Sequence, residues 1–190
     1  MTKALVFDCF GVFYVDPVFA YMRNLHSPKD KAKTLHDLDE QAARGRLSKA
    51  NFITQASELL NLSSQETDDR FFQGHDRNDE LVAYVQELRK HYKIALLSNI
   101  GADMMDGFFT QQERNELFDT VVLSGSTGYA KPDLEIFKLT CGRLGVEPNG
   151  AVMIDDVQSN CDGAKAIGMQ AVQYQSFRQM KQELESILHE

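Results

Sequence analysis

Short apolar runs alternate along much of the chain with segments in which apolar residues recur at helical spacing. Runs this short suit strands that are buried on both faces of a parallel sheet. Because strands alternate with helices, the pattern predicts an α/β fold with a doubly wound parallel sheet. The predicted strands are residues 4–7, 93–97, 120–123 and 151–154, with a short fifth strand at 170–174.

The helices predicted from residue 79 onward alternate with the remaining strand-like runs. Leu134, Phe137 and Leu144 recur at helical spacing and are expected to face the interior. Gly168 is expected to close a helix, because glycine often follows the last helical residue. The predicted helices of this part are residues 79–92, 103–117, 133–144 and 160–167, and a terminal helix that begins at 176.

Between the first two strands the strand-like runs disappear and helix formers dominate. Ser48 predicts a helix start, the Ser63–Glu66 segment forms a capping box, and Gly45 predicts a helix end. Ser27-Pro28 predicts a further start, with proline at the first helical position. Residues 16–79 are therefore predicted to be an all-helical domain inserted into a core made of residues 1–15 and 80–190.

Composition limits the classes of function. The 190-residue chain has a formal net charge of −8 and no long basic patch, so a nucleic-acid partner is not expected. No apolar run approaches the roughly 18 residues of a membrane span, and the pattern at the amino terminus does not indicate a signal peptide. Three cysteines without a CxxC pair fit a reduced, cytoplasmic protein. Oligomeric state is not predicted.

Polar residues follow four of the five predicted strands. Because the carboxyl ends of parallel strands meet at one edge of a sheet, we expect these side chains to lie together. Carboxylates there could hold a divalent cation, while a hydroxyl, a backbone N–H and an ammonium could hold phosphate oxygens. The residues are Asp8, Ser98 with Asn99, Lys131, and the pair Asp155 and Asp156.

Each of these residues also has a purely structural interpretation. Asp8 at a strand tip could be a nucleophile, a metal ligand or a turn residue. Lys131 alone fits a solvated loop lysine. The pair Asp155 and Asp156 is harder to explain structurally, because adjacent carboxylates at the end of an apolar strand need a nearby cation. The coincidence of all four positions favours a phosphate and metal site.

The motifs in question are Phe7-Asp8-Cys9-Phe10-Gly11-Val12, Leu97-Ser98-Asn99, Lys131-Pro132-Asp133, and Ile154-Asp155-Asp156 followed by Asn160. In order and spacing they resemble the haloacid dehalogenase-like hydrolase superfamily over essentially the whole chain. The resemblance implies a Rossmann-like core, with residues 16–79 as a small α-helical cap. Residues 44–48 also resemble a segment common in that cap.

The resemblance further implies a magnesium-dependent phosphatase that forms an aspartyl phosphate on Asp8, with Lys131 as a second catalytic residue. Its substrate would be a small phosphorylated metabolite. The implied Mg²⁺ ligands are Asp8, the backbone carbonyl of Phe10, Asp155 and Asp156. The implied substrate-binding residues are Cys9 (through its backbone N–H), Phe10, Ser98, Asn99 and Lys131.

One position of this chain departs from the motif that is usual in the family it resembles. Phosphatases of this family usually carry a second aspartate two residues after the nucleophile, where this chain has Phe10. A positioned general acid contributes roughly 10²–10⁴ in rate. Its replacement implies a slow phosphatase, a substitute acid, or a different reaction. Asp16 is the nearest acidic residue that follows in the sequence.

Two alternatives to a phosphatase remain open at this point. The similar 2-haloacid dehalogenases have an aromatic residue at the position of Phe10, and they displace halide with the same aspartate. They do not keep an acidic pair equivalent to Asp155 and Asp156, so this interpretation ranks second. The other alternative is a weakly catalytic regulatory protein that binds a phosphorylated ligand in the same pocket.

Overall fold

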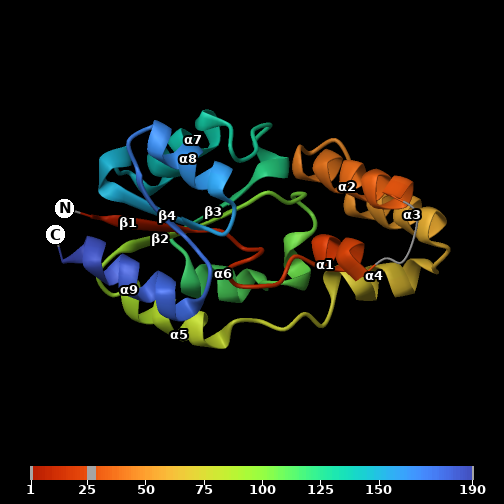
Figure 1. Ribbon diagram of the computed structural model, residues 1–190, viewed down its shortest axis with the longest axis horizontal. Coiled ribbons are helices and arrows are strands. Elements are labelled where there is room, and N and C mark those ends of the chain that lie inside the picture. Colours follow the sequence, from red (N-terminus) through yellow and green to blue (C-terminus); the bar gives the residue numbers. More distant parts are fainter. Residues whose placement is uncertain (1, 25–28, 190) are drawn as a thin grey trace.

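The computed structural model describes residues 2–24 and 29–189, which form a helix-covered sheet with a bundle of helices beside it (Figure 1). We call this bundle the helical insert. It follows the first strand and precedes the second, as the sequence predicts. The insert comprises α1 (Pro17–Asn24), α2 (Lys29–Ala43), α3 (Lys49–Leu60) and α4 (Ser64–Phe72).

The described residues form a five-stranded, wholly parallel sheet in the order β3-β2-β1-β4-β5, which confirms the predicted fold class. β1 is central, and its last residue Phe7 pairs with Leu96 and Ile154. The chain runs outward from β1 in both directions, which makes the carboxyl end of β1 a topological switch point. The strands are β1 (Ala4–Phe7), β2 (Lys93–Ser98), β3 (Thr120–Leu123), β4 (Ala151–Asp155) and β5 (Gln170–Gln173).

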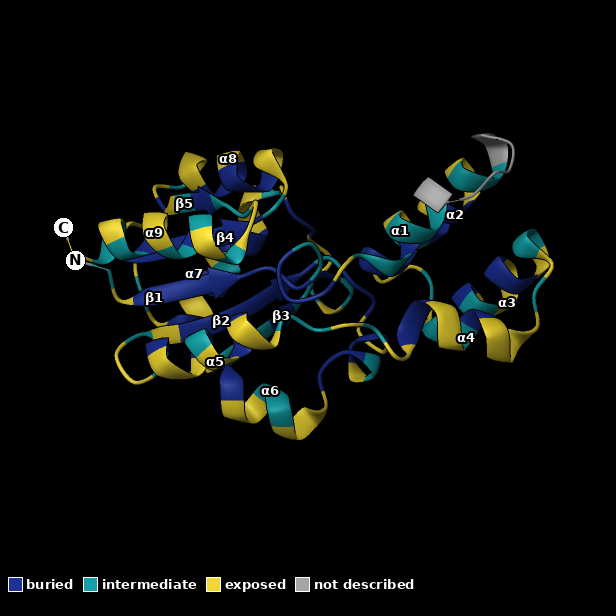
Figure 2. Ribbon diagram, turned by 60° about the horizontal axis from the view of Figure 1, so that its bottom comes forward, coloured by how far each residue is buried: buried dark blue, intermediate teal, exposed yellow. Residues whose placement is uncertain are grey.

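Both faces of the sheet are buried, because alternate residues of β1 belong to two separate apolar clusters. Leu5 and Phe7 pack with α5, α6 and α9, whereas Ala4 and Val6 pack with α7 and α8. Figure 2 shows the buried strands between helices whose outer faces are exposed. The helices are α5 (Asp79–Leu88), α6 (Gln111–Leu117), α7 (Leu134–Leu144), α8 (Gln158–Ala166) and α9 (Phe177–Leu188).

Helix caps account for most of the predicted boundaries. Ser48 accepts a hydrogen bond from the Asn51 amide, and Ser63 with Glu66 completes a capping box, as predicted. The helical region predicted at 103–117 is confirmed, and it consists of two elements, the 3₁₀ turn Met105–Gly107 and the helix Gln111–Leu117 that Thr110 caps. The predicted start at residues 27–28 lies outside the described residues.

Two predictions of helix detail are wrong. The helix predicted at 79–92 ends at Leu88, so it is shorter than its apolar pattern suggested. Leu134 was expected to face the interior but is 37% exposed. It is the first residue of α7, and the buried residues of that helix begin with Ile136 and Phe137.

The helical insert contacts the core where α2 ends. The Ser124 hydroxyl, just after β3, donates a hydrogen bond to the Ala43 carbonyl. Arg44 Nη1 lies 3.3 Å from Asp133 Oδ2. Gly45, with φ of +70°, lies so close to the core that an added Cβ would be 2.3 Å from the Gly125 carbonyl oxygen. These contacts hold the carboxyl end of α2 against the carboxyl edge of the sheet.

Within the described residues, no helix combines the length and the apolar character that crossing a membrane would require.

Candidate functional site

Asp8 lies at the carboxyl end of the central strand and is 6% exposed. Its Oδ1 accepts a hydrogen bond of 2.6 Å from the Cys9 amide. The turn that follows needs glycine at position 11, because φ is +79° and a Cβ there would lie 2.2 Å from the Asp156 carboxyl carbon. The backbone after Asp8 therefore packs directly on the Asp156 side chain.

Lys131 lies between two of the carboxylates that the sequence predicted to meet. Its Nζ is 2.6 Å from Asp8 Oδ1 and 2.7 Å from Asp155 Oδ2, and its side chain is almost fully buried. Burial alone would lower the pKa of Lys131, but the charges of Asp155 and Asp8 outweigh burial and raise it. Lys131 is therefore a permanently charged ammonium at the centre of the site.

Burial has the opposite effect on Asp8. It raises the pKa of the Asp8 carboxyl well above the ordinary value, and the charge of Asp155 adds to the effect while Lys131 opposes it. A further cation beside Asp8 would favour its ionised form. The neighbouring Cys9 thiol is fully buried, and burial followed by the charge of Asp8 raises its pKa. A neutral thiol is a poor nucleophile, so Asp8 is the better candidate.

Asp155 and Asp156 complete an acidic cluster with Asp8. Oxygen atoms from the three carboxylates lie within 4.8 Å of one another. Asp155 is fully buried and accepts hydrogen bonds of 3.0 and 3.1 Å from Asn160 Nδ2. Asn160 was not predicted as a site residue. Its position in the sequence could have indicated this role, because a carboxamide on the first turn of α8 can reach back to the end of β4.

Ser98 and Asn99 differ in what their side chains do. The Ser98 hydroxyl is buried and has no hydrogen-bond partner among residues 2–24 and 29–189. An unpartnered buried hydroxyl is costly, which suits a group that awaits a ligand. The Asn99 side chain instead binds the backbone of Lys131, accepting from its N at 2.8 Å and donating to its carbonyl at 2.9 Å.

A small cavity of about 30 Å³ lies between the site and the helical insert. Phe10 and Asn99 line it from the core, and aromatic side chains of α3 and α4 line it from the insert. The Phe10 ring packs edge-on against Phe108, with centroids 4.8 Å apart. Two acidic side chains, Asp16 and Asp39, also face this cavity.

Asp39 was not predicted from the sequence. It lies on α2, four residues after the buried Leu35 and next to the buried Leu38, so it borders the apolar face of the helix. An acidic residue beside the apolar face of a helix is the feature of the sequence that could have identified Asp39 as a candidate site residue.

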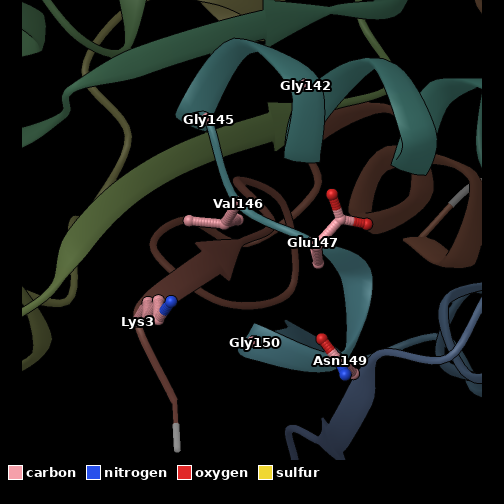
Figure 3. A pocket seen from close by; sticks show the side chains of 7 residues that line it. All are labelled: Lys3, Gly142, Gly145, Val146, Glu147, Asn149 and Gly150. Carbon is pink, nitrogen blue, oxygen red and sulfur yellow. The ribbon is translucent and has the colours of Figure 1, made fainter.

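An open hollow of about 610 Å³ lies at the other edge of the sheet (Figure 3). Lys3 and Gly150, which line it, precede β1 and β4. Ligands of open α/β sheets bind outside the carboxyl ends of the strands, so this amino-terminal hollow is not the expected place for chemistry.

Comparisons with known proteins show which proteins this chain resembles. D-ribitol-5-phosphate phosphatase from Bacteroides thetaiotaomicron is 28% identical over 206 residues and covers 100% of both chains. (S)-2-haloacid dehalogenase 4A from Burkholderia cepacia is 24% identical over 189 residues, covering 90% of this chain and 81% of that protein. The chain is thus similar to a phosphatase and to a dehalogenase.

A solved structure shows the same fold. It is a HAD family enzyme from Bacteroides thetaiotaomicron in complex with magnesium and inorganic phosphate, with a TM-score of 0.76 at 21% identity. The match covers 93% of this chain and 96% of that one. A family model described as haloacid dehalogenase-like hydrolase matches residues 2–168, which include Asp8, Lys131 and Asp155. The chain therefore belongs to the haloacid dehalogenase-like hydrolases.

Proposed function

We propose that the chain is a cytoplasmic, magnesium-dependent phosphatase that acts on a small phosphorylated metabolite through an aspartyl phosphate on Asp8. The observation that carries this proposal is the position of the Lys131 ammonium, 2.6 Å from Asp8 and 2.7 Å from Asp155. A nucleophilic carboxylate attacks a phosphate dianion only if nearby cations offset the repulsion between them. Residues 1–15 and 80–190 form the catalytic core in this proposal, and residues 16–79 form its cap.

The residues at the sheet edge have separate roles in this reaction. The Asp8 carboxylate attacks phosphorus, and the substrate oxygen leaves on the opposite side. The Lys131 ammonium stabilises the charge on the transferring phosphoryl group. Ser98 binds a phosphate oxygen through its unpartnered hydroxyl, and Asn99 does so through its backbone N–H. The Cys9 N–H, which the resemblance also assigns to the phosphate, donates to Asp8 Oδ1 in the structure and would have to leave that oxygen when substrate binds.

The acidic cluster fits Mg²⁺. Its donors are carboxylate oxygens within 4.8 Å of one another, and Mg²⁺ prefers hard oxygen ligands completed by water. In this proposal Asp8, Asp155, Asp156 and the Phe10 carbonyl hold the ion. The ion would supply positive charge that favours ionised Asp8 and screens it from the substrate phosphate.

Dehalogenation is the second candidate, and Phe10 is the observation that favours it. A halide needs no protonation to leave, so a dehalogenase needs no acid at that position. The same enzyme would also need no metal, and burial with the charge of Asp155 would then keep the pKa of Asp8 raised, with Lys131 as the cation that opposes them. The acidic cluster therefore favours the phosphatase.

The substrate class follows from the relatives. The phosphatase that aligns along its full length with this chain acts on D-ribitol 5-phosphate by its name. We propose phosphorylated sugars and alditols as the first compounds to test.

A substrate panel tests the proposal. Wild type and Asp8→Asn are incubated with sugar and alditol phosphates, p-nitrophenyl phosphate and 2-haloacids, each with and without Mg²⁺. We expect phosphate release that needs Mg²⁺ and Asp8. Metal-independent halide release would favour the dehalogenase. Saturable binding of a phosphate ester without turnover would instead favour a regulatory protein.

A further inference from the structure

A phosphatase of the proposed kind lacks an obvious group to protonate its leaving oxygen. Phosphoryl transfer to Asp8 is in line, so the leaving oxygen lies on the side of phosphorus away from Asp8. Phe10 and Asn99, which border the site, also line the cavity under the helical insert. An acid that serves this oxygen therefore has to face that cavity.

We propose that Asp39 of α2 is the general acid and base of this reaction, acting on the substrate from the helical insert. This inference rests on the proposed function. Asp39 and Phe10 line the same cavity, one from the insert and the other from the core. The insert thus supplies the carboxyl group that the turn after Asp8 lacks.

Asp39 is better placed for this role than Asp16, which shares the cavity. Asp16 Oδ1 accepts a hydrogen bond of 2.8 Å from the Phe19 amide and so caps α1. The Asp39 carboxyl has no hydrogen-bond partner in the described part of the chain. Asp16 is the charged group that faces Asp39 from the neighbouring loop, and His36 on α2 faces Asp16 in turn.

The protonation of Asp39 suits both halves of the reaction. Burial raises the pKa of Asp39 to about 7, and the charge of Asp16 adds to the effect. A general acid and base works best when its pKa lies near the working pH. Both forms of Asp39 are therefore populated at neutral pH.

The core fixes the part of α2 that carries Asp39. Ala43, one helical turn further along, receives the hydrogen bond from the Ser124 hydroxyl. The same hydroxyl accepts a hydrogen bond of 3.0 Å from the Ile100 amide, and Ile100 lines the cavity. One anchor thus holds both the helix end and a cavity wall, which places Asp39 at a defined position relative to Asn99.

His75 is the competing candidate, because its Nε2 is buried without a partner within residues 2–24 and 29–189. Its ring stacks on Phe108 with centroids 5.4 Å apart, and Phe108 also packs edge-on against Phe10 and Tyr14. His75 does not line the cavity. Phe108 therefore stands between His75 and the leaving oxygen.

The proton transfers balance over the two steps. In the first, Asp8 forms a bond to phosphorus, the ester P–O bond breaks, and the Asp39 carboxyl gives its proton to the departing alkoxide. In the second, the Asp39 carboxylate takes a proton from water as that water attacks phosphorus. The Asp8–phosphorus bond then breaks, which releases phosphate and restores both aspartates.

The test compares leaving groups in single-turnover experiments with Mg²⁺. p-Nitrophenolate leaves without protonation, whereas the alkoxide of β-glycerophosphate needs it. For Asp39→Asn we expect first-turnover cleavage of β-glycerophosphate to fall by roughly 10²–10⁴, with p-nitrophenolate release retained within about threefold. With substrate in excess, slow second-step hydrolysis should then limit turnover, so p-nitrophenolate should appear in a burst of about one equivalent followed by a slow phase. Asp39→Ser, once shown to be folded, should show the same selective loss as Asp39→Asn on the two esters.

Asp37→Asn is the matched control, because Asp37 lies on the same helix and is exposed. It should leave both reactions unchanged. Equal losses on both esters, or no loss on either, would overturn the role of Asp39. The same selective loss in Asp16→Asn but not in Asp39→Asn would assign the role to Asp16. Undiminished cleavage by Asp8→Asn, or no cleavage of either ester by wild type, would instead overturn the proposed function.

Discussion

The carboxamide of Asn99 forms two hydrogen bonds with the backbone of Lys131, accepting from its N at 2.8 Å and donating to its carbonyl at 2.9 Å. These residues lie at the ends of different loops, one after β2 and the other before α7. The contact fixes the backbone whose side chain reaches between Asp8 and Asp155. The Asn99 side chain is therefore a positioning group for the Lys131 ammonium.

Replacing Asn99 should reveal that positioning role. Asn99→Ala removes two hydrogen bonds at about 0.5–1.5 kcal/mol each, so the free energy of unfolding should fall by roughly 1–3 kcal/mol. The phosphatase kcat should fall at least tenfold, because the lysine loses its fixed position. Chemical denaturation and steady-state kinetics measure the two effects. Wild-type kcat in Asn99→Ala would contradict this role.

Topology explains how much of the site the sequence predicted. Asp8, Ser98, Lys131 and Asp155 follow different strands, and a parallel sheet brings all strand ends to one edge. The pairing of Asn99 with Lys131 depends on the path of two loops. Periodicity does not determine such paths, because many loop conformations join the same two elements.

Asp39 was missed for a related reason. Its position on α2 could be placed on a helix face from the sequence, but not against the core. That placement depends on the Ala43 to Ser124 hydrogen bond and on the approach of Gly45 to Gly125. Contacts between an inserted domain and its core are long-range, and a helical pattern carries no information about them.

Two glycines test the docking of the helical insert. Gly45 and Gly74 both have positive φ, but an added Cβ at Gly45 would lie 2.3 Å from the Gly125 carbonyl oxygen, and one at Gly74 would meet nothing within 4 Å. Gly74→Ala should therefore destabilise by only about 1–2 kcal/mol. Gly45→Ala should destabilise more and should also lower kcat.

Thermal unfolding and turnover of the two glycine variants measure this difference. Equal loss of stability in both, with kcat unchanged in each, would mean that the close approach of Gly45 to Gly125 does not hold the insert in place.

Magnesium should stabilise the folded protein, because the acidic cluster exists only there. At a hundredfold excess over its dissociation constant, a ligand of the native state adds about 2.7 kcal/mol, which corresponds to a Tm increase of several degrees. Asp156→Asn should reduce that increase, whereas Asp76→Asn, at an exposed position, should not. A wild-type Tm that does not change when Mg²⁺ is added would contradict the proposed metal site.

Asp39 should make stability depend on pH in a defined direction. Its pKa rises from 3.8 to about 7 on folding, because of burial and then Asp16. Between these values the folded state holds a proton that the unfolded state has lost, so stability falls as pH rises through this window. Asp39→Asn removes this contribution, and the variant should gain stability relative to wild type between pH 4 and pH 8.

Denaturation of both proteins across that pH range measures the difference. Asp8 and Asp156 also have raised pKa values, but they are present in both proteins and so do not contribute to the difference. Asp16 interacts with Asp39, so the pH-dependent difference reports Asp39 together with this interaction. A difference in unfolding free energy that stays constant with pH would show that Asp39 titrates alike in the folded and unfolded states.

The central claim is that Asp8 becomes phosphorylated during turnover. Wild-type protein with Mg²⁺ is mixed with p-nitrophenyl phosphate that carries a radiolabelled phosphoryl group, quenched in acid within one turnover, and digested for peptide mapping. The account predicts label on the peptide that contains Asp8, lost on mild alkaline treatment and absent in Asp8→Asn. Hydrolysis at the wild-type rate by Asp8→Asn, or label on another residue, would contradict it.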